Sequence, residues 1–183
     1  MTYVGELGWE LHTPAEYGLH VWDTLWAAGQ SFGVAACGYH CVDTLRFEKG
    51  YRYWGAELTP EYTPYEAGLG FCVKLNKGDF VGRAALLDQK ERGVGRKLCC
   101  LLLDQGAPVV WGREPILDGA ETIGRVTGGN AGHTIGRSIA YGYLPVERAA
   151  VGARYAIEIA GAAWGASVSA EPLWDPKNER IKS

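Results

Sequence analysis

The chain has 183 residues, 47% of them hydrophobic and 21% charged, which is typical of a globular protein able to bury a sizeable core. A formal net charge of -3, with both signs interspersed, gives no electrostatic basis for binding nucleic acid. No apolar run approaches the roughly 18 residues of a membrane span, and no secretory leader pattern is found. We therefore expect a location in the cytoplasm, or in the mitochondrial matrix of a eukaryote.

Two elements are predicted at the start of the chain. Residues 6–13 alternate between polar and apolar side chains, which predicts a half-buried strand. Thr13 and Pro14 then suit the start of a helix. Apolar residues recur at helical spacing over 15–28, and Gly29 is a natural helix terminator.

Further helices and strands follow as far as residue 95. A short apolar stretch, 32–36, and a second one, 69–75, are both interpreted as strands. Between them, residues 40–49 predict a helix that ends at Gly50. Residues 82–92 predict a charged helix that ends at the following glycine.

From Arg96 onward the pattern changes to short β-like runs, with turns at Asp118-Gly119 and Gly128-Gly129. Such runs predict antiparallel strands that close as a small barrel or sandwich. We therefore expect an α+β fold with two domains, 1–95 and 96–183. The predicted strands are 97–104, 114–117, 121–126, 138–144, 154–159 and 163–170.

The five cysteines are odd in number and lie in apolar contexts, so we interpret them as reduced thiols in the protein core. A zinc site needs about four converging ligands, and neighbouring Cys99 and Cys100 would point to opposite faces of a strand. No metal site is therefore expected. The cysteines are Cys37, Cys41, Cys72, Cys99 and Cys100.

Glu6, beside Tyr3, is a candidate binding residue. A carboxylate can accept two parallel N–H bonds from a guanidine-like edge, such as the amino-pyrimidinone of a pterin. The alternative is an exposed acid at the start of a strand. Glu10 lies nearby, and its position in the predicted strand suggests the solvated face.

A second group of candidates follows the second helix. Arg52, Tyr53 and Trp54 combine a cation with aromatic rings, which can sandwich a planar heterocycle and bind its carboxylate tail. The alternative is that these aromatics fill a domain junction while Arg46 pairs with Glu48 or Glu57.

Blocks along the whole chain resemble the aminomethyltransferase (glycine cleavage T-protein) family. They are most similar to the folate-binding region at the C-terminus of dimethylglycine and sarcosine dehydrogenases. The blocks are YVGELGWEL (3–11), DTLRFEKGYR (43–52), WGAELTPE (54–61), TPYEAGLGF (63–71), KGDFVGR (77–83), GRSIA (136–140) and EPLWDP (171–176).

The resemblance implies a tetrahydrofolate-dependent one-carbon transfer module, or a fragment of one, linked to the catabolism of methylated glycine or glycine. It implies that Glu6 contacts the pterin and that Trp54 and Tyr53 line the folate channel, with Tyr3 and Arg52 beside them. The catalytic residue remains unknown. A family arginine is replaced by Val42, which fits the dehydrogenase-linked branch.

Family members carry well over a hundred residues before the Tyr-x-Gly-Glu motif, including part of the pterin pocket. We therefore expect exposed apolar surface, at Trp9, Trp22 and Phe71 for example, and self-association or docking onto a separately encoded N-terminal half. No Gly-x-Gly-x-x-Gly fingerprint is present, so FAD is not expected in this chain and a flavin oxidoreductase is a further candidate partner. A non-catalytic folate-binding or assembly module is the alternative function, and whether the chain is an enzyme stays open.

Overall fold

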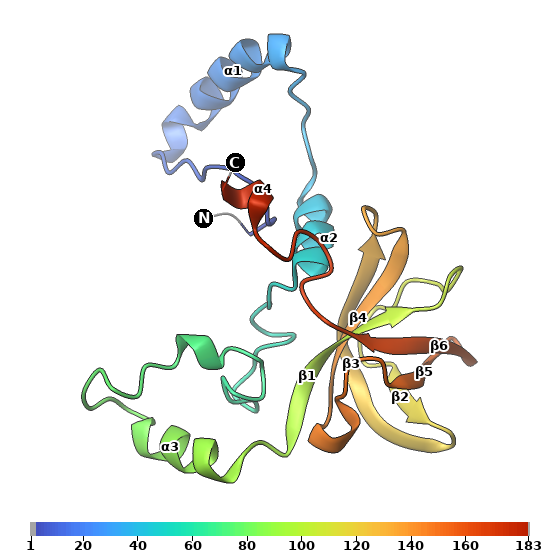
Figure 1. Cartoon of the computed structure of the whole chain (residues 1–183). Helices are drawn as coiled ribbons and strands as arrows, with labels where there is room; N and C mark the ends of the chain where they lie inside the picture. The colour runs from blue at the N-terminus through green and yellow to red at the C-terminus, as the bar shows by residue number, and fades with distance from the viewer. Residues whose placement is uncertain (1–2, 183) are drawn as a thin grey trace.

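A computed structural model describes residues 3–182 (Figure 1). Its C-terminal part is a closed antiparallel barrel with the strand order β1-β4-β3-β2-β5-β6. This confirms the predicted α+β fold with a C-terminal barrel. The strands are β1 (Arg96–Leu103), β2 (Pro115–Asp118), β3 (Glu121–Gly132), β4 (Arg137–Pro145), β5 (Arg154–Ile159) and β6 (Ala162–Ser169).

Helices precede the barrel, and a short one follows it. The three predicted helices are confirmed as α1 (Gly18–Gly29), α2 (Tyr39–Lys49) and α3 (Arg83–Arg92), and α4 (Glu179–Lys182) closes the described chain. None of the helices in residues 3–182 is long and apolar enough to cross a membrane. The single-turn 3-10 helices are η1 (Ala15–Tyr17), η2 (Gln30–Phe32), η3 (Gly70–Cys72) and η4 (Val146–Arg148).

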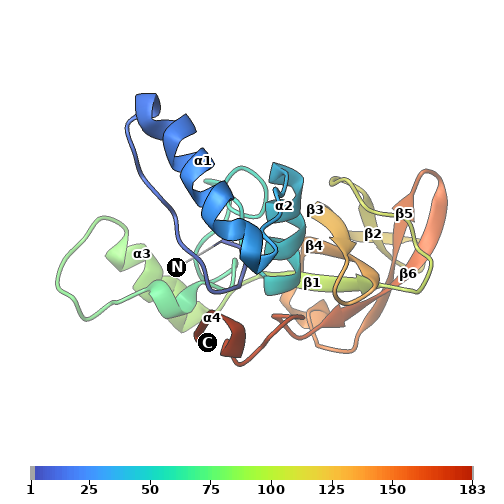
Figure 2. The same ribbon diagram turned by 90° about the horizontal axis from the view of Figure 1, so that it is seen from above.

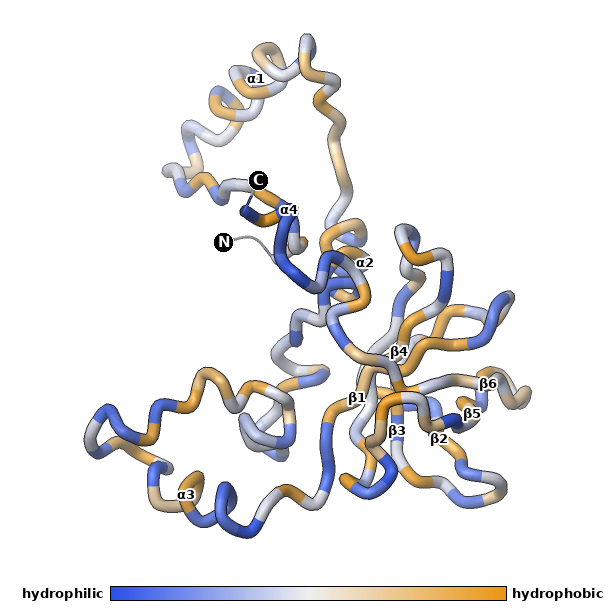
Figure 3. Tube along the Cα trace, viewed as in Figure 1, coloured by the Kyte–Doolittle hydropathy of each residue, from blue (hydrophilic) through white to orange (hydrophobic). Residues whose placement is uncertain are grey.

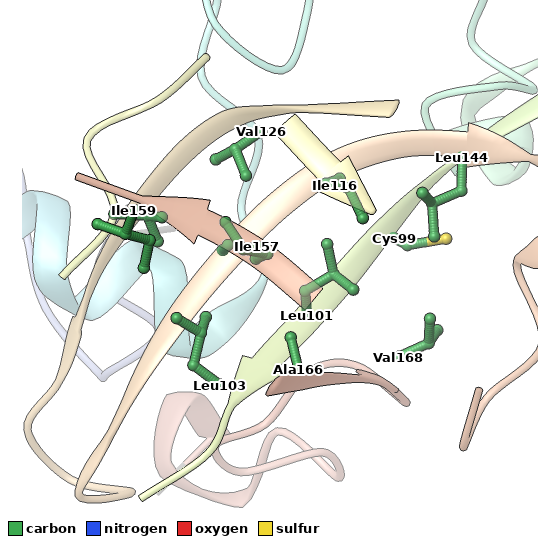
Figure 4. Packing of buried hydrophobic residues seen from close by; sticks show 12 residues of the cluster. Cys99, Leu101, Leu103, Ile116, Val126, Leu144, Ile157, Ile159, Ala166 and Val168 are labelled. Carbon is green, nitrogen blue, oxygen red and sulfur yellow. The ribbon is translucent and has the colours of Figure 1, made fainter. Parts of the chain in front are cut away.

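Two hydrophobic layers hold the barrel together. Alternate strand residues point inward and fill its interior, as Figure 4 shows for Leu101, Ile116 and Ile157. A second layer lies outside the wall, where Phe47 of α2 packs against residues of β1 and β4. Because successive strand residues face opposite sides, Cys99 belongs to the interior cluster and Cys100 to the outer one.

Helix α2 lies between the barrel and the rest of the molecule. Viewed from above, the barrel strands are on one side of α2, and α1 and α3 are on the other (Figure 2). The apolar side chains of α1 are exposed, and hydrophobic positions run along its trace far from the barrel (Figure 3). The predicted exposure of Trp9, Trp22 and Phe71 is confirmed, at 80%, 54% and 73%.

Three predicted strands are wrong. Residues 6–13 and 33–36 have no regular structure, and η3 replaces the strand expected over 69–75. A strand needs a neighbour to pair its backbone N–H and C=O groups, and within residues 3–182 these segments join no sheet. The pattern of apolar residues in these segments did not show whether a neighbouring strand was present.

The turn expected at Gly128-Gly129 is also wrong, because both residues lie inside β3, next to a register shift. A Cβ atom on Gly128 would lie 2.9 Å from Glu57 Oε1 and 3.1 Å from Phe47 Cζ. The glycine is therefore needed where α2 and the following loop press on the barrel wall. The turn predicted at Asp118-Gly119 is confirmed, between β2 and β3.

The interpretation of the cysteines as core thiols holds for two of the five. Cys99 and Cys100 are buried, whereas Cys37 and Cys72 are exposed and Cys41 is half-buried. Cys37 and Cys72 lie in segments that no other part of the described chain covers. For these residues, the apolar sequence context predicted burial wrongly.

Candidate functional site

The site is built on the C-terminal end of α2. Gly50 adopts the left-handed conformation, with φ of 72°, and its N–H caps the carbonyls of Arg46 and Phe47. The last helical turn, residues 46–49, is fully buried although three of its four side chains are charged. Charges buried in this way need partners, and those partners define the surroundings of the site.

Arg46 is held by two carboxylates. It donates from Nε to Asp43 Oδ1 at 2.5 Å and from Nη1 to Glu57 Oε2 at 3.0 Å. Burial alone would lower the pKa of Arg46, but the nearby carboxylates of Glu57 and Asp43 outweigh it and raise the pKa. The alternative pairing of Arg46 with Glu57 is thus what the structure contains.

The aromatic turn after α2, which contains Tyr53 and Trp54, contacts the Arg46–Glu57 ion pair. The Tyr53 backbone N–H donates to Glu57 Oε2 at 2.8 Å, and the Arg46 guanidinium lies 5.2 Å from the Tyr53 ring centre. Trp54 forms a backbone bridge with Leu58, and its side chain is 69% exposed. In this turn the Tyr53 ring is partly covered, and the Trp54 ring is exposed to solvent.

Tyr3 lies against the same turn. Its hydroxyl donates to the Arg52 carbonyl at 2.6 Å, and its ring stacks on Tyr51 with centres 5.9 Å apart. Burial raises the pKa of Tyr3, so its hydroxyl is protonated at neutral pH. The structure therefore brings the predicted residues Tyr3 and Arg52 into direct contact.

Arg52 fastens the C-terminal segment of residues 171–182, which we call the strap. Its Nη1 donates to Glu171 Oε2 at 2.9 Å and its Nη2 to Glu171 Oε1, a bidentate pair. Burial would lower the pKa of Arg52, but Glu171 raises it. The cation expected to bind a ligand's carboxylate thus has a carboxylate partner within the chain.

The strap also binds the end of α2. Lys49 Nζ donates to the Asp175 carbonyl at 2.6 Å and to Asp175 Oδ2 at 3.0 Å, with both side chains buried. The backbone N–H of Trp174 donates to the backbone carbonyl of Glu48 at 3.0 Å. These contacts fix the first half of the strap.

Glu6 meets the strap through both carboxylate oxygens. Trp174 Nε1 donates to Oε1 at 3.0 Å, and Arg180 Nε donates to Oε2 at 2.9 Å. Burial would raise the pKa of Glu6, but these hydrogen bonds outweigh it and hold the pKa below its ordinary value. Glu6 is thus an ionised acceptor of two N–H bonds, although it does not lie in a strand.

Two pockets flank the strap. One, of about 370 Å³, is lined by residues 49–52 of the turn, by Phe71 and by the strap. The other, also about 370 Å³, is lined by the strap alone, from Trp174 to Arg180. The candidate site therefore comprises Glu6, the turn after α2 and the strap between them.

Sequence reasoning did not assign roles to Trp174, Asp175 and Arg180. Trp174 and Asp175 belong to the EPLWDP block, which carried the resemblance without indicating a contact. Arg180 lies 174 residues from Glu6 along the chain, so no local pattern points to their pairing. In residues 3–182, no group of three or more His, Cys, Asp or Glu side chains is arranged to hold a metal ion.

Comparison with known proteins gives the family. Residues 1–77 match the model of the GCVT N-terminal domain, and residues 96–175 match the glycine cleavage T-protein C-terminal barrel domain. The chain belongs to the glycine cleavage T-protein family. The resemblance found in the sequence is thereby confirmed.

Relatives in two enzyme groups cover nearly all of the chain. Mitochondrial sarcosine dehydrogenase of Mus musculus is 40% identical over 190 residues, covering 100% of this chain and 21% of the relative. Mitochondrial dimethylglycine dehydrogenase of Homo sapiens is 36% identical over 185 residues, and again 21% of it is covered. Aminomethyltransferase of Symbiobacterium thermophilum is 40% identical over 182 residues, covering 97% of this chain and 48% of the relative.

A solved structure has the same fold. The glycine cleavage system aminomethyltransferase T from Bartonella henselae superposes with a TM-score of 0.81 at 27% identity, covering 89% of this chain and 45% of that one. The chain thus spans about a fifth of the length of the dehydrogenases and just under half of that of the aminomethyltransferases.

Proposed function

We propose that this chain is part of a tetrahydrofolate-dependent one-carbon transfer module that acts in the catabolism of methylated glycine or glycine. Its relatives include sarcosine dehydrogenase and aminomethyltransferase, so the donor would be an iminium or aminomethyl group from a small methylated amine. When bound, tetrahydrofolate supplies the nucleophilic nitrogen that accepts the one-carbon unit.

The observation that carries the proposal is the state of the Glu6 carboxylate. Both of its oxygens accept N–H bonds, one from an indole and one from a guanidinium, and its pKa is below the ordinary value. An ionised carboxylate that accepts one N–H bond on each oxygen fits the amino-pyrimidinone edge of a pterin, which offers two parallel N–H groups. Glu6 would then orient the pterin ring.

The other predicted residues support that role. The Trp54 ring is exposed and can stack on a ligand. The backbone N–H of Tyr53 is held by Glu57, which also pairs with Arg46. Tyr3 and Arg52 hold the turn to the N-terminal motif through their mutual hydrogen bond. Fixing the ligand in one orientation toward the donor carbon can lower the reaction barrier by several kcal/mol, in order of magnitude.

Isothermal titration of tetrahydrofolate into the purified chain tests this proposal. We expect saturable binding that is lost in Glu6→Ala and kept in the matched variant Glu10→Ala, because Glu10 is exposed and lies four residues away. Equal binding by the wild type and Glu6→Ala would contradict the assignment of Glu6.

A second candidate is a non-catalytic folate-binding or assembly module. The exposed apolar face of α1, formed by Leu19, Trp22, Leu25 and Trp26, favours it, since a patch of this kind normally contacts a partner. We propose that this face packs against a further part of the same family module, with a second copy of the chain or a flavin oxidoreductase as alternatives.

Light scattering and turnover assays separate these candidates. A chain that binds tetrahydrofolate but shows turnover only with a co-expressed preceding region of an aminomethyltransferase belongs to a composite enzyme. A chain that binds tetrahydrofolate without turnover in any combination is a binding module. A homodimer that becomes monomeric in Trp22→Ser would identify the partner of α1 as a second copy.

The remaining expectations are proposals as well. We propose that the chain divides near residue 95 into a folate-binding part and a barrel domain. We also propose a cytoplasmic location, or the mitochondrial matrix if the protein is eukaryotic; the mouse and human dehydrogenases are named as mitochondrial.

A further inference from the structure

Lys49 is a buried lysine at the C-terminal end of α2, and its ammonium group is bound to the strap. The side chain is 1% exposed, and Nζ donates to the carbonyl of Asp175 at 2.6 Å and to Asp175 Oδ2 at 3.0 Å. A cation buried to this extent would be costly without such partners. The Lys49 ammonium therefore fixes Asp175 of the strap to the end of α2.

The aliphatic part of Lys49 packs against the backbone directly before Glu6. A Cβ atom on Gly5 would lie 2.6 Å from Lys49 Cγ and 2.7 Å from its Cδ, which is too close for a normal contact. Gly5 is itself buried, and the lysine is held at Nζ, so neither group has room to move aside. Lys49 thus limits where the backbone of Glu6 can lie.

Asp175, which Lys49 holds, also places two donors of Glu6. Trp174 directly precedes it, and its indole Nε1 donates to Glu6 Oε1 at 3.0 Å. The Asp175 carboxylate accepts the backbone N–H of Arg180 at 3.1 Å, and Arg180 Nε donates to Glu6 Oε2 at 2.9 Å. Both donors are therefore attached to the residue that Lys49 fixes.

We propose that Lys49 is a positioning residue that sets the orientation of the Glu6 carboxylate, through Gly5 on one side and Asp175 on the other. This inference rests on the proposed function, because it assumes that Glu6 contacts the pterin. An ionised carboxylate has about four acceptor sites, so the indole of Trp174 orients Glu6 and stays in place when a ligand binds. The two N–H groups of the pterin then meet a carboxylate whose orientation is already fixed, which reduces the entropy cost of binding.

The test removes both charges of the buried pair at once. Lys49→Met keeps most of the length of the side chain, and Asp175→Asn keeps an acceptor oxygen at a position with φ of 45°, which Asn tolerates. Because neither charge is left buried alone, the double variant should fold, and thermal unfolding checks this. The matched control neutralises an exposed ion pair of α3, with Asp88→Asn and Arg92→Gln.

Tetrahydrofolate binding is then measured in a cycle with Glu6→Gln, which keeps one acceptor oxygen. Neutralising the buried pair should weaken binding about tenfold, and Glu6→Gln should weaken it by a similar factor in the wild-type chain. In the neutralised chain Glu6→Gln should add less than about twofold, because both changes act on the same contact. The control in α3 should bind like the wild type.

The indole N–H resonance of Trp174, assigned with Trp174→Phe, gives a readout that needs no ligand. Glu6→Gln should shift this resonance in the wild-type chain, because the indole donates to the Glu6 carboxylate. In the neutralised chain the same substitution should leave the resonance nearly unchanged, because the indole is no longer held against Glu6.

The outcomes separate the two proposals. Weaker binding by the neutralised chain, with little further loss from Glu6→Gln, supports the role of Lys49. Losses that multiply, or binding equal to that of the wild type, overturn this role and leave the proposed function standing. An absence of binding by the folded wild-type chain overturns the proposed function and the role of Lys49 with it. If the neutralised chain does not fold, Lys49→Arg replaces it in the same cycle, because arginine keeps the charge and displaces the donor atoms.

Discussion

The chain buries different kinds of side chain before and after residue 96. In the barrel the buried residues are almost all apolar, and they form an interior cluster and an outer one under α2. Among the described residues before 96, the fully buried side chains are mostly charged, namely those of Arg46, Glu48, Lys49 and Glu57, with Phe47 and Ala67 as the apolar exceptions. The large apolar residues of α1 and of the segment before it lie outside instead.

This difference shows how each region is stabilised. The barrel gains its stability from apolar area removed from water, which needs no specific partner. The earlier region packs on the barrel through Phe47. It is also held by two buried ion pairs, Arg46–Glu57 within it and Lys49–Asp175 to the strap, and each pair depends on both partners being present. Its apolar surface is available to a further protein segment. The following predictions test this distinction, starting with the largest expected effect.

Breaking a buried ion pair should affect the earlier region most. Arg46→Ala leaves the Glu57 carboxylate, 1% exposed, without its cation, so we expect the free energy of unfolding to fall by about 3–5 kcal/mol. Urea unfolding followed by circular dichroism measures this loss. The control Arg113→Ala, at an exposed position, should change it by less than about 1 kcal/mol. Equal effects of the two variants would contradict the comparison.

Opening a cavity in the barrel should rank second. Leu101 is fully buried inside the barrel, so Leu101→Ala should lower the free energy of unfolding by about 2–5 kcal/mol. Leu19→Ala on the exposed face of α1 removes the same atoms and should stay within about 0.5 kcal/mol. The same urea titration compares them, and a large effect at Leu19 would mean that α1 is covered in solution.

The reactivity of the cysteines should also differ between the barrel and the earlier region. Burial raises the pKa of Cys99 to about 11 and of Cys100 to about 12, while Cys37 and Cys72 are exposed. With a pKa two units higher, the thiolate fraction at pH 8 falls about a hundredfold, so the barrel thiols should react with a disulfide reagent only after unfolding. The double variant Cys37→Ser, Cys72→Ser should lose the fast phase. Fast labelling that survives in this variant, beyond that of half-buried Cys41, would show that the barrel opens.

The smallest effect is expected from acid at the strap. The Glu6 pKa is lowered in the folded chain, so its hydrogen bonds stabilise the fold fully above the unfolded value of about 4.5. That contribution is lost as the pH falls through the lowered folded value. Asp175 acts in the same direction, because burial would raise its pKa but Lys49 and two backbone N–H groups lower it. The indole N–H resonance of Trp174, assigned with Trp174→Phe, should therefore shift below about pH 4. A constant resonance down to pH 3 would argue against the contact with Glu6.

Local signals in the sequence predicted the regular elements that stand on short-range chemistry. Helix α2 ends where Gly50 supplies the left-handed cap, and the six barrel strands lie where β-like runs were predicted, although β3 continues to Gly132. The strand predicted over 6–13 failed because pairing depends on a neighbour, and no neighbour is encoded nearby. Gly128 was read as a turn although it serves the close approach of Glu57 to the barrel.

The candidate site was predictable only in part. The family motif pointed to Glu6, and the chemistry of a carboxylate predicted two N–H donors. The donors themselves come from Trp174 and Arg180, which lie 168 and 174 residues away along the chain. Contacts at that separation follow from the path of the strap around α2, which composition and periodicity do not describe.

The closure of the barrel depends on its shortest strand. Strand β2 has four residues and pairs with β5 only through Ile116 with Ile157 and Leu117 with Ala156, yet it joins β5 to the longest strand, β3. If β2 detaches, β3 and β5 become open edges whose free N–H and C=O groups can recruit strands from other molecules. Aggregation on heating should therefore begin at this seam, while the rest of the barrel is still folded.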